Sequence, residues 1–318
     1  MNSQIKAASS QTNYATKIEI ASNLRKYKAL YIMAIPSILY FIIFKYIPLL
    51  GTIIAFQDYN IFKGFLGSPF VGLKNFGIML QYGDFLQILI NTLVISFYDL
   101  IFGFTAPLIL ALMIYEKTNT PFKKVVQQTI YMPHFLSWTV LGGIIVTQLL
   151  SPSSGLINIL LKSIGVEPIY FMIKPEMARG IVVLAGIWRD TGWGTIIYLA
   201  ALTAISPNLY ESAEIDGAGK VRQLLSITLP SLIPIITTLF LLRIGHFLDF
   251  GFERVYVFLN GSISSKIEIF DTYIYKTGLQ QGRYSLTTAV GLFKSLVGFV
   301  LLFCGNKLSK KLTGESLY

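Results

Sequence analysis

Charged residues are scarce in this chain: they make up 13% of its 318 residues, whereas 53% are hydrophobic. Soluble globular domains carry about 25% charged residues, so this chain has too few to cover a soluble surface. The mean hydropathy is +0.62. This composition excludes a disordered chain, a fibrous repeat and an ordinary cytosolic enzyme, and it favours a polytopic membrane protein.

Cysteine and histidine are also rare. Cys304 is the one cysteine and cannot form an internal disulfide, so cysteine usage indicates no redox compartment. His134 and His246 lie far apart, and no His-Glu-x-x-His, Gly-x-Ser-x-Gly or Asp-x-Asp motif is present. We therefore expect no metal site, no catalytic residues and no cofactor, and we interpret His134 as a helix-end or packing residue.

A phosphate-binding loop for ATP is missing as well. Gly219-Lys220 is followed by Val221 instead of Ser or Thr, and Glu214 stands where the first glycine of that motif would be. The chain is not expected to hydrolyse ATP by itself.

Long apolar stretches dominate the rest of the chain. A membrane-spanning helix needs about 20 mostly apolar residues. Six stretches qualify, approximately Ala29–Phe56, Leu86–Tyr115, Val125–Leu150, Gly180–Ile205, Ile227–Phe250 and Leu286–Gly305. The first is too long for the core of a signal peptide, and no small-residue cleavage site follows it. The sequence predicts an all-α polytopic protein with six transmembrane helices.

The distribution of Lys and Arg predicts the orientation of these helices. With the N-terminus inside, the cytoplasmic segments are residues 1–28, the loop with Lys117 and Lys123, the loop with Lys220, and the tail of residues 305–318. They hold more Lys and Arg per residue than the outer loops do, as the positive-inside rule requires. We expect a protein of the cytoplasmic membrane with both termini in the cytoplasm.

Ionisable residues within apolar spans are costly and usually face protein or water. In the fourth span, Arg189-Asp190 lies between Trp188 and Trp193, beside two glycines. This pattern indicates either an interrupted helix that lines a cavity, where aromatic faces suit sugar rings, or a packing notch with a charge pair. The candidates for a substrate path, chosen by aromatic and polar character, are Trp188, Arg189, Asp190, Trp193, Tyr198, Arg243 and His246.

The fifth span carries Arg243, His246 and Asp249 at intervals of three residues. On a helix these side chains share a sector of roughly 120°. The stripe is part of a translocation path or a polar staple between helices, and the staple is favoured because no further polar residue continues it. Asp99 and Lys294 are expected to pair across helices.

The segment of residues 206–230 between the fourth and fifth spans has its own local structure. Ser206 and Pro207 suit a helix N-cap and first turn, and Asp216-Gly217 suits a break near Ile215. A second short helix is expected to reach about Ser226, before Leu229-Pro230 opens the fifth span. The sequence predicts a compact cytoplasmic helix–turn–helix, which is more typical of a docking element than of a connector.

This segment resembles the EAA loop of type I ABC importer permeases. The family pattern is Glu-Ala-Ala, three residues, Gly, nine residues, Ile, one residue, Leu-Pro. Here Glu211-Ser212-Ala213, Gly217, Ile227 and Leu229-Pro230 match it, and Ser212 is the one departure. The resemblance implies that these residues dock in a separate ATPase subunit. The implied ATPase-coupling residues are Tyr210, Glu211, Ser212, Ala213, Asp216, Gly217, Ile227, Leu229 and Pro230.

Other segments are similar to the polysaccharide and multiple-sugar branch of this family. They include Tyr131-Met132-Pro133-His134, Gly192-Trp193-Gly194 and Gly67-Ser68-Pro69-Phe70. The branch implies a first helix and outer loop at residues 29–87 and a type 1 transmembrane core at residues 88–304. It also implies a second, non-identical permease subunit, two ATPase subunits and an extracytoplasmic sugar-binding protein.

Three functions are compared on these grounds. The resemblance implies a permease subunit that moves an oligosaccharide or polysaccharide fragment, coupled to separate ATPases. A secondary sugar transporter driven by an ion gradient would need paired interrupted helices and a carboxylate-rich midplane, of which the sequence offers little. A membrane enzyme of sugar–lipid chemistry would need clustered catalytic acids near the interface, and none is found.

Overall fold

The computed structural model describes residues 26–116 and 121–313 of the chain. Most of the predicted N-terminal tail, Lys117 and residues 314–318 therefore lie outside the described residues. The chain divides into two compact units, Met1–Ile54 and Ala55–Tyr318. Each unit is described by itself.

The first unit contributes one long helical run, Lys28–Phe56, which continues into the start of the second. It consists of α2 (Lys28–Phe41), η1 (Ile42–Tyr46), α3 (Ile47–Leu50) and η2 (Gly51–Phe56). Neither α2 nor α3 buries a residue within the chain. A helix that is apolar all round and unburied in its own chain suits contact with lipid or another subunit.

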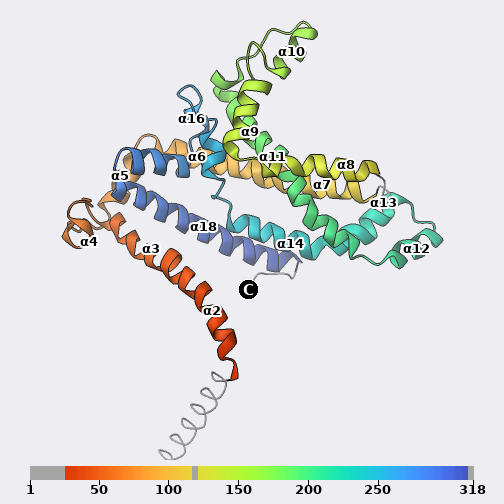
Figure 1. The fold of residues 1–318 in the computed structure, drawn as a ribbon, viewed down its shortest axis with the longest axis horizontal. Coiled ribbons are helices and arrows are strands. Elements are labelled where there is room, and N and C mark those ends of the chain that lie inside the picture. The colour runs from red at the N-terminus through yellow and green to blue at the C-terminus, as the bar shows by residue number, and fades with distance from the viewer. Residues whose placement is uncertain (1–25, 117–120, 314–318) are drawn as a thin grey trace, which may run out of the picture. The chain divides into compact units, whose positions relative to one another are not determined.

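The second unit is helical throughout its described residues, apart from turns and one isolated antiparallel bridge between Gln57 and Phe70. Its N-terminal half contains α4 (Gly64–Gly67), α5 (Lys74–Gln81), α6 (Phe85–Tyr98), η3 (Asp99–Gly103), α7 (Phe104–Tyr115), α8 (Pro121–Tyr131), η4 (Met132–Phe135), α9 (Trp138–Ile144), η5 (Ile145–Leu149), α10 (Leu156–Ser163) and η6 (Phe171–Ile173). Its C-terminal half contains α11 (Pro175–Thr203), α12 (Pro207–Ile215), α13 (Lys220–Gln223), η7 (Leu224–Thr228), α14 (Leu229–Gly245), α15 (Phe252–Tyr256), α16 (Ser264–Ile267), α17 (Phe270–Tyr273), η8 (Ile274–Gln280) and α18 (Tyr284–Thr313). In Figure 1, α12 and α5 lie at opposite ends of this unit, and α10 projects away from the long helices.

Four helical runs in the described part of the chain are long and apolar enough to cross a membrane: Lys28–Phe56, Phe85–Tyr115, Lys220–Gly245 and Tyr284–Lys311. They correspond to the first, second, fifth and sixth predicted spans, with ends shifted by a few residues. The sixth was expected to end near Gly305, but α18 continues to Thr313. The all-α membrane architecture is confirmed, and the number of six spans stays a prediction.

The third predicted span is not one straight helix. Its two halves, Pro121–Phe135 and Trp138–Leu149, are bent by 110° at a short break. Pro133 lies in the 3₁₀ turn η4, and the Ser137 hydroxyl then accepts a hydrogen bond from the Val140 N–H, which starts a new helix. A proline followed by a helix cap ends one helix and opens another, so the predicted stretch Val125–Leu150 is a bent pair of helices, and its crossing of the membrane stays a prediction.

The fourth predicted span is the opposite case, because α11 runs without interruption from Pro175 to Thr203. The expectation of a broken helix at residues 188–194 was wrong, and the alternative, a packing notch beside a charge pair, is what the structure contains. Its glycines admit close neighbours: a Cβ at Gly192 would overlap the Ile130 carbonyl, and one at Gly194 would lie 3.0 Å from Pro107. Glycine here permits close packing without a break in the helix.

The polar stripe expected on the fifth span is also corrected. α14 ends at Gly245, and His246 and Asp249 lie in the turns that follow. The three side chains therefore do not share one helix face.

The core of the second unit consists of three clusters of buried apolar residues. One surrounds Leu141, Val182 and Phe258, the second surrounds Ile88 and Phe270, and the third surrounds Leu202 and Leu232. Helix α11 contributes to the first and third clusters, so this long helix connects the two ends of the core.

Candidate coupling and substrate sites

The first candidate site is the hairpin of residues 206–230, whose local structure largely follows the prediction. Pro207 begins α12, and Ser206 has the extended backbone of an N-cap, although its side chain makes no cap hydrogen bond. Gly217 has φ +77°, the left-handed conformation that glycine adopts most easily. The Gly217 N–H donates to the Glu214 carbonyl and the Ala218 N–H to the Ala213 carbonyl, which is the Schellman end of a helix.

The second arm of the hairpin differs from the prediction. α13, η7 and α14 form one uninterrupted helical run, Lys220–Gly245. Leu229-Pro230 therefore lies inside this run, and the expected boundary near Ser226 does not exist. Proline is accepted there because the preceding residues adopt a wider π-helical turn, η7, in which the usual hydrogen-bond ladder is already altered. The hairpin is thus attached directly to a long apolar helix.

Side-chain contacts hold α12 against the start of this helix. The Tyr210 hydroxyl lies 3.0 Å from Thr228 Oγ1, and Lys220 Nζ donates to Glu214 Oε1 at 3.0 Å. The hydrogen bond from Lys220 lowers the pKa of Glu214, so the pair persists at neutral pH and is lost only as the pH falls through that lowered value. Since Glu214 is fully exposed, this pair contributes little to stability.

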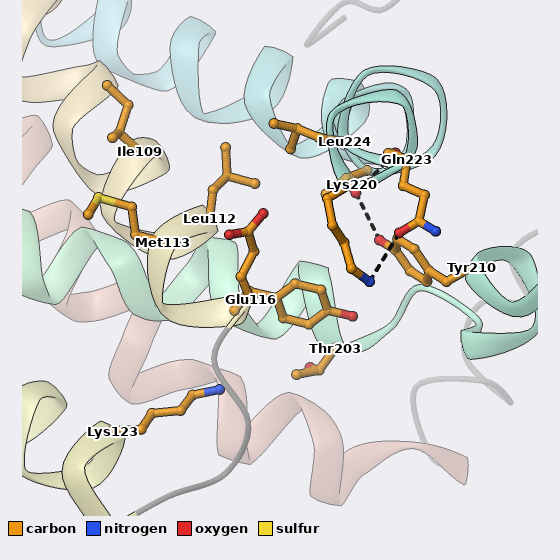
Figure 2. A pocket seen from close by; sticks show the side chains of 12 residues that line it. Ile109, Leu112, Met113, Glu116, Lys123, Thr203, Tyr210, Lys220, Gln223 and Leu224 are labelled. Carbon is orange, nitrogen blue, oxygen red and sulfur yellow. Dashed lines mark hydrogen bonds between the residues drawn. The ribbon is translucent and has the colours of Figure 1, made fainter. Parts of the chain in front are cut away.

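A cavity of about 820 Å³ lies beside the hairpin, as Figure 2 shows. Ile109, Leu112 and Met113 of α7 form one side of it, and Tyr210 and Lys220 face it from the hairpin. α12 buries no residue of its own, and Ile215 is 87% exposed. Few apolar contacts within the chain therefore hold α12, and Glu211, Ser212, Asp216 and Gly217 are all exposed.

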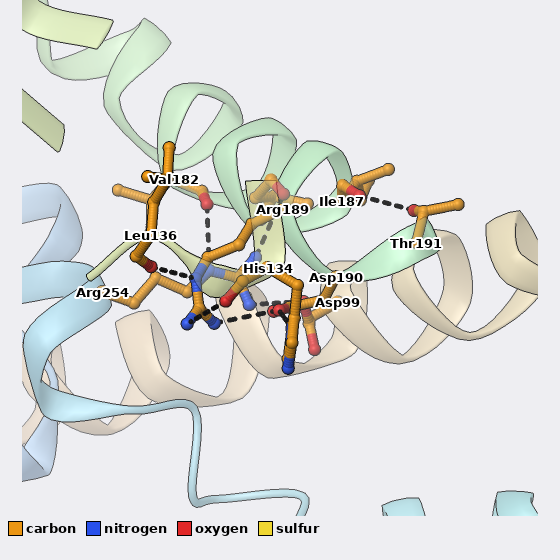
Figure 3. A network of polar contacts seen from close by, with 10 residues as sticks. Asp99, His134, Leu136, Val182, Ile187, Arg189, Asp190, Thr191 and Arg254 are labelled. Carbon is orange, nitrogen blue, oxygen red and sulfur yellow. Dashed lines mark hydrogen bonds and ion pairs between the residues drawn. The ribbon is translucent and has the colours of Figure 1, made fainter. Parts of the chain in front are cut away.

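The second candidate site is a group of charged side chains in the middle of the helices, centred on Asp99. Asp99 opens the π-helical turn η3 and is buried. Arg254 Nη1 donates to its Oδ1 at 2.8 Å, and Arg243 Nη2 pairs with its Oδ2. Arg254, only 4% exposed, also donates to the carbonyls of Val182 and Val183. Figure 3 shows Arg254 with Asp99 and Val182.

A second pair lies next to the first. Arg189 Nη1 donates to Asp190 Oδ1 at 3.0 Å, and its other nitrogens donate to the carbonyls of Leu136 and His134. His134 Nδ1 lies 3.0 Å from the same Asp190 oxygen, and its ring stacks on Trp193 with centroids 4.6 Å apart. His134 is thus a packing residue, as expected, and also a polar partner. The carbonyls of His134 and Leu136 can accept hydrogen bonds from Arg189 because the helical run Pro121–Phe135 ends at this point.

A small polar pocket of about 140 Å³ opens on the Asp99 group. One water occupies about 30 Å³ in the liquid, so the pocket has room for about five waters. Ser96, Asp99, Trp138, Asp190, Arg243 and His246 are among its lining residues. Ser96 is 3% exposed, and its hydroxyl has no hydrogen-bond partner among the described residues. The oxygen atom itself is buried, so a ligand in the pocket does not reach it in this structure.

The structure therefore brings together some of the substrate-path candidates and separates others. Asp190, Arg243 and His246 line the pocket. Arg189 does not line it but donates to Asp190, and Trp193 does not line it but stacks on His134, which is a partner of Asp190. Trp188 is exposed on another part of α11. Tyr198 is buried in the third apolar cluster and does not line the pocket.

Sequence reasoning missed Ser96, Trp138 and Arg254 and gave Asp99 the wrong partner. Lys294 does not pair with Asp99: its Nζ lies 2.6 Å from Asp271 Oδ1 and 2.6 Å from Asp249 Oδ1. The partners of Asp99 come from residues 144 and 155 positions later in the chain. No local spacing could indicate such distant pairs, although a buried aspartate in a span did indicate that some cation would approach it.

Comparison with known proteins gives relatives over nearly the whole chain. The polygalacturonan/rhamnogalacturonan transport system permease protein YteP of Bacillus subtilis is 47% identical over 291 residues, which cover 92% of this chain and 90% of YteP. Protein LplB of the same organism is 45% identical and covers 93% and 92%. The arabinooligosaccharides transport system permease protein AraP, also of Bacillus subtilis, is 31% identical and covers 91% of each chain. No protein-family model matches the chain.

Solved structures agree with these relatives. A chain of a bacterial ABC transporter involved in the import of the acidic polysaccharide alginate superposes with a TM-score of 0.86 at 37% identity and covers 93% of this chain and 99% of that one. A second structure of the alginate transporter, in complex with its pentasaccharide-bound periplasmic protein, gives the same TM-score and identity.

Proposed function

Since this chain belongs to the permease family of saccharide ABC importers, we propose that its cargo is an oligosaccharide that carries carboxylate groups. Members of this family are transport subunits, and ATP is hydrolysed by separate ATPase subunits, so the chain is a membrane permease and not an enzyme. An ion-gradient-driven transporter is thereby set aside. The relative named for polygalacturonan and rhamnogalacturonan and the importer of acidic alginate both support an acidic cargo.

The observation that carries this proposal is the accessible guanidinium of Arg243 in the Asp99 group. Arg243 and Arg254 pair with Asp99, and Arg189 pairs with Asp190. Asp249 also lines the pocket and shares the single cation of Lys294 with Asp271, so the charges of these groups balance. Arg254 is buried and saturated with acceptors, whereas the side chain of Arg243 is 42% exposed. Arg243 is therefore the cation that a sugar carboxylate can approach.

Ser96 and Trp138 border the pocket but are already enclosed: the Ser96 oxygen is buried, and the guanidinium groups of Arg189 and Arg254 lie over the Trp138 ring at 4.8 and 5.6 Å. The side chains of Asp190, Arg243 and His246 are at least 42% exposed, so a ligand can reach them. Of the earlier candidates, Asp190, Arg243 and His246 are kept for the path on these grounds, with Arg189 and Trp193 as supports. Trp188 and Tyr198 have no such contact.

Arg243→Gln should reduce uptake of an acidic oligosaccharide by about 10- to 100-fold, the equivalent of one charged hydrogen bond of about 1.5–3 kcal/mol. Uptake of a neutral oligosaccharide of equal length should change much less. Asp99 keeps Arg254 as its partner in this variant, so the fold should survive. The measurement is uptake of both sugars by the complete importer in proteoliposomes, with Arg243→Lys as the charge-preserving control. Equal losses for both sugars would show that Arg243 is structural.

The hairpin of residues 206–230 is proposed as the contact with an ATPase subunit. It is exposed, it has little apolar packing of its own, and it is rigidly joined to the helical run Lys220–Gly245. A displacement of the hairpin is therefore transmitted along that run. ATP binding can drive such a displacement only if the hairpin binds the two ATPase states with different affinity. Glu211, Ala213 and Gly217 are the proposed centre of this contact.

Within the assembled importer, the proposed partners are a second permease, two ATPase subunits and an extracytoplasmic binding protein. The alginate transporter in complex with its periplasmic protein supports the last of these. We retain residues 88–304 as the proposed transmembrane core, preceded by the helix and outer loop of residues 29–87.

Both termini are proposed to be cytoplasmic, on the same side as the hairpin. In a Cys304→Ser background, a cysteine at Ser212 in the hairpin should resist a membrane-impermeant maleimide in intact cells, whereas one at Ser163, at the end of α10, should react. Both positions are exposed in the chain, but Ser212 lies in the proposed ATPase contact, so labelling of the purified chain without ATPase subunits is the control for shielding by that partner. Labelling at Ser212 but not at Ser163 would reverse the orientation.

A further inference from the structure

A loop after the first span presents apolar side chains to its surroundings. We call Ile61, Phe62, Phe65 and Leu66 the outer tip; they lie in and just before the one-turn helix α4 (Figure 1). Phe62 is 95% exposed, Leu66 is fully exposed, and the other two are also exposed. Apolar side chains this exposed, gathered within six positions, are unusual on a surface that faces only water.

The loop that carries the outer tip is held in shape by hydrogen bonds. The Asp58 N–H donates to the Pro69 carbonyl at 2.9 Å, and Gln57 Nε2 donates to the Phe65 carbonyl at 2.8 Å. The buried Ser68 hydroxyl accepts from the Asn60 N–H and donates to the Gly64 carbonyl. These bonds join the two ends of the loop, so the outer tip cannot fold back to bury its side chains without breaking them.

The base of the loop is fixed at the end of a membrane-spanning helix. The Tyr59 N–H donates to Ser285 Oγ at 2.9 Å, and the Tyr59 and Tyr284 rings are 6.1 Å apart. Tyr284 is the first residue of α18, whose run Tyr284–Lys311 is long and apolar enough to cross a membrane. Tyrosine is enriched where the hydrocarbon meets the headgroups. The outer tip therefore begins a few residues from that boundary.

We propose that the outer tip inserts into the interfacial layer of the bilayer and anchors the importer to its lipid on that side. In the proposed orientation this is the outer leaflet. Lys63 lies within the tip and Lys74 opens α5, and both are exposed, so their ammonium groups can reach lipid phosphates while the neighbouring rings enter the acyl boundary. Aromatic and aliphatic side chains bordered by lysines are typical of interfacial segments.

Exposed apolar side chains also lie along α18. Leu296, Phe299 and Phe303 on α18 are exposed within the chain, as residues in contact with lipid are. A soluble binding protein is the other possible occupant of the outer tip. It is less suited, because its release at each cycle would return two fully exposed apolar side chains to water, whereas lipid is always present.

The experiment uses the assembled importer in lipid nanodiscs that contain anionic phospholipid. In a Cys304→Ser background, a nitroxide label is placed by Phe62→Cys or Leu66→Cys, and by Asp58→Cys at the base of the same loop as a matched control. Collision of each label with dissolved oxygen, which prefers lipid, is compared with collision with a neutral nickel chelate, which prefers water. We expect oxygen to exceed nickel at positions 62 and 66, and nickel to exceed oxygen at position 58.

Three outcomes would overturn the proposal. Labels at positions 62 and 66 that meet nickel as readily as the label at position 58 would place the tip in water. Labels shielded from both reagents would place it against a protein subunit. Labels that lose mobility only when the binding protein is added would assign the tip to that partner. Because none of these readouts uses uptake or sugar specificity, they are independent of the proposed cargo.

Discussion

Gly217→Pro is expected to abolish saccharide uptake while the chain still inserts and assembles. Gly217 has φ +77°, whereas proline fixes φ near −65°, and its N–H, which donates to the Glu214 carbonyl, would be lost. The end of α12 must then change direction. Since the proposed ATPase contact centres on this turn, ATP-driven movement would no longer reach the helical run Lys220–Gly245. Uptake and ATP hydrolysis are measured on the same proteoliposomes.

Two matched variants separate the shape of the turn from loss of a glycine. Gly217→Asn should keep most uptake, because asparagine tolerates the left-handed conformation. Gly219→Ala should be close to normal, since Gly219 has φ −70° and nothing lies within 4 Å of its added Cβ. Normal uptake by Gly217→Pro would refute the assignment of the hairpin as the coupling contact.

A side-chain test accompanies this backbone test. Glu211 and Glu214 are both exposed on α12, but Glu214 is paired with Lys220, whereas no ion pair among the described residues involves Glu211. Glu211→Ala should therefore uncouple uptake from ATP hydrolysis more strongly than Glu214→Ala. If the two variants lost coupling to the same extent, the total negative charge of α12, and not Glu211 in particular, would be what the ATPase subunit recognises.

Gly186→Ala is expected to destabilise the folded chain by about 3–5 kcal/mol, the cost of breaking a buried ion pair. A Cβ at Gly186 would overlap the guanidinium of Arg254. Arg254 would have to leave Asp99 and the carbonyls of Val182 and Val183, so its buried guanidinium would lose all of these acceptors. The measurement is thermal unfolding of the detergent-solubilised importer, followed by the yield of assembled complex.

Gly180→Ala is the control on the same helix. Gly180 is exposed, and nothing lies within 4 Å of its added Cβ, so alanine there should be neutral or stabilise α11 by about 0.5–1 kcal/mol. Equal stability of the two variants would mean that Arg254 can leave its site at little cost, and the Asp99 group would then not be a structural centre of the fold.

These two glycines differ in how far the sequence alone could explain them. Gly217 follows a helix whose start and end have local signals: Pro207 at the first position and a break after Ile215. Gly186 has no local signal. Glycine is required there because the guanidinium of Arg254, a residue far along the chain, occupies the space that a Cβ would need. Of the two alternatives for Trp188–Gly194, the interrupted helix is wrong for the same reason, since the glycines there admit Ile130 and Pro107 and do not break α11.

By itself the sequence determined the membrane class, most of the apolar spans and the turn of the hairpin of residues 206–230. Each of these depends on the hydropathy or backbone preference of residues that are neighbours in the chain. Only the tertiary structure decided the bend after Pro133, the partners of Asp99 and the pocket at Ser96 and Arg243. A buried charge requires a partner, but which helix delivers it depends on how the helices pack, and residue spacing along the chain does not contain that information.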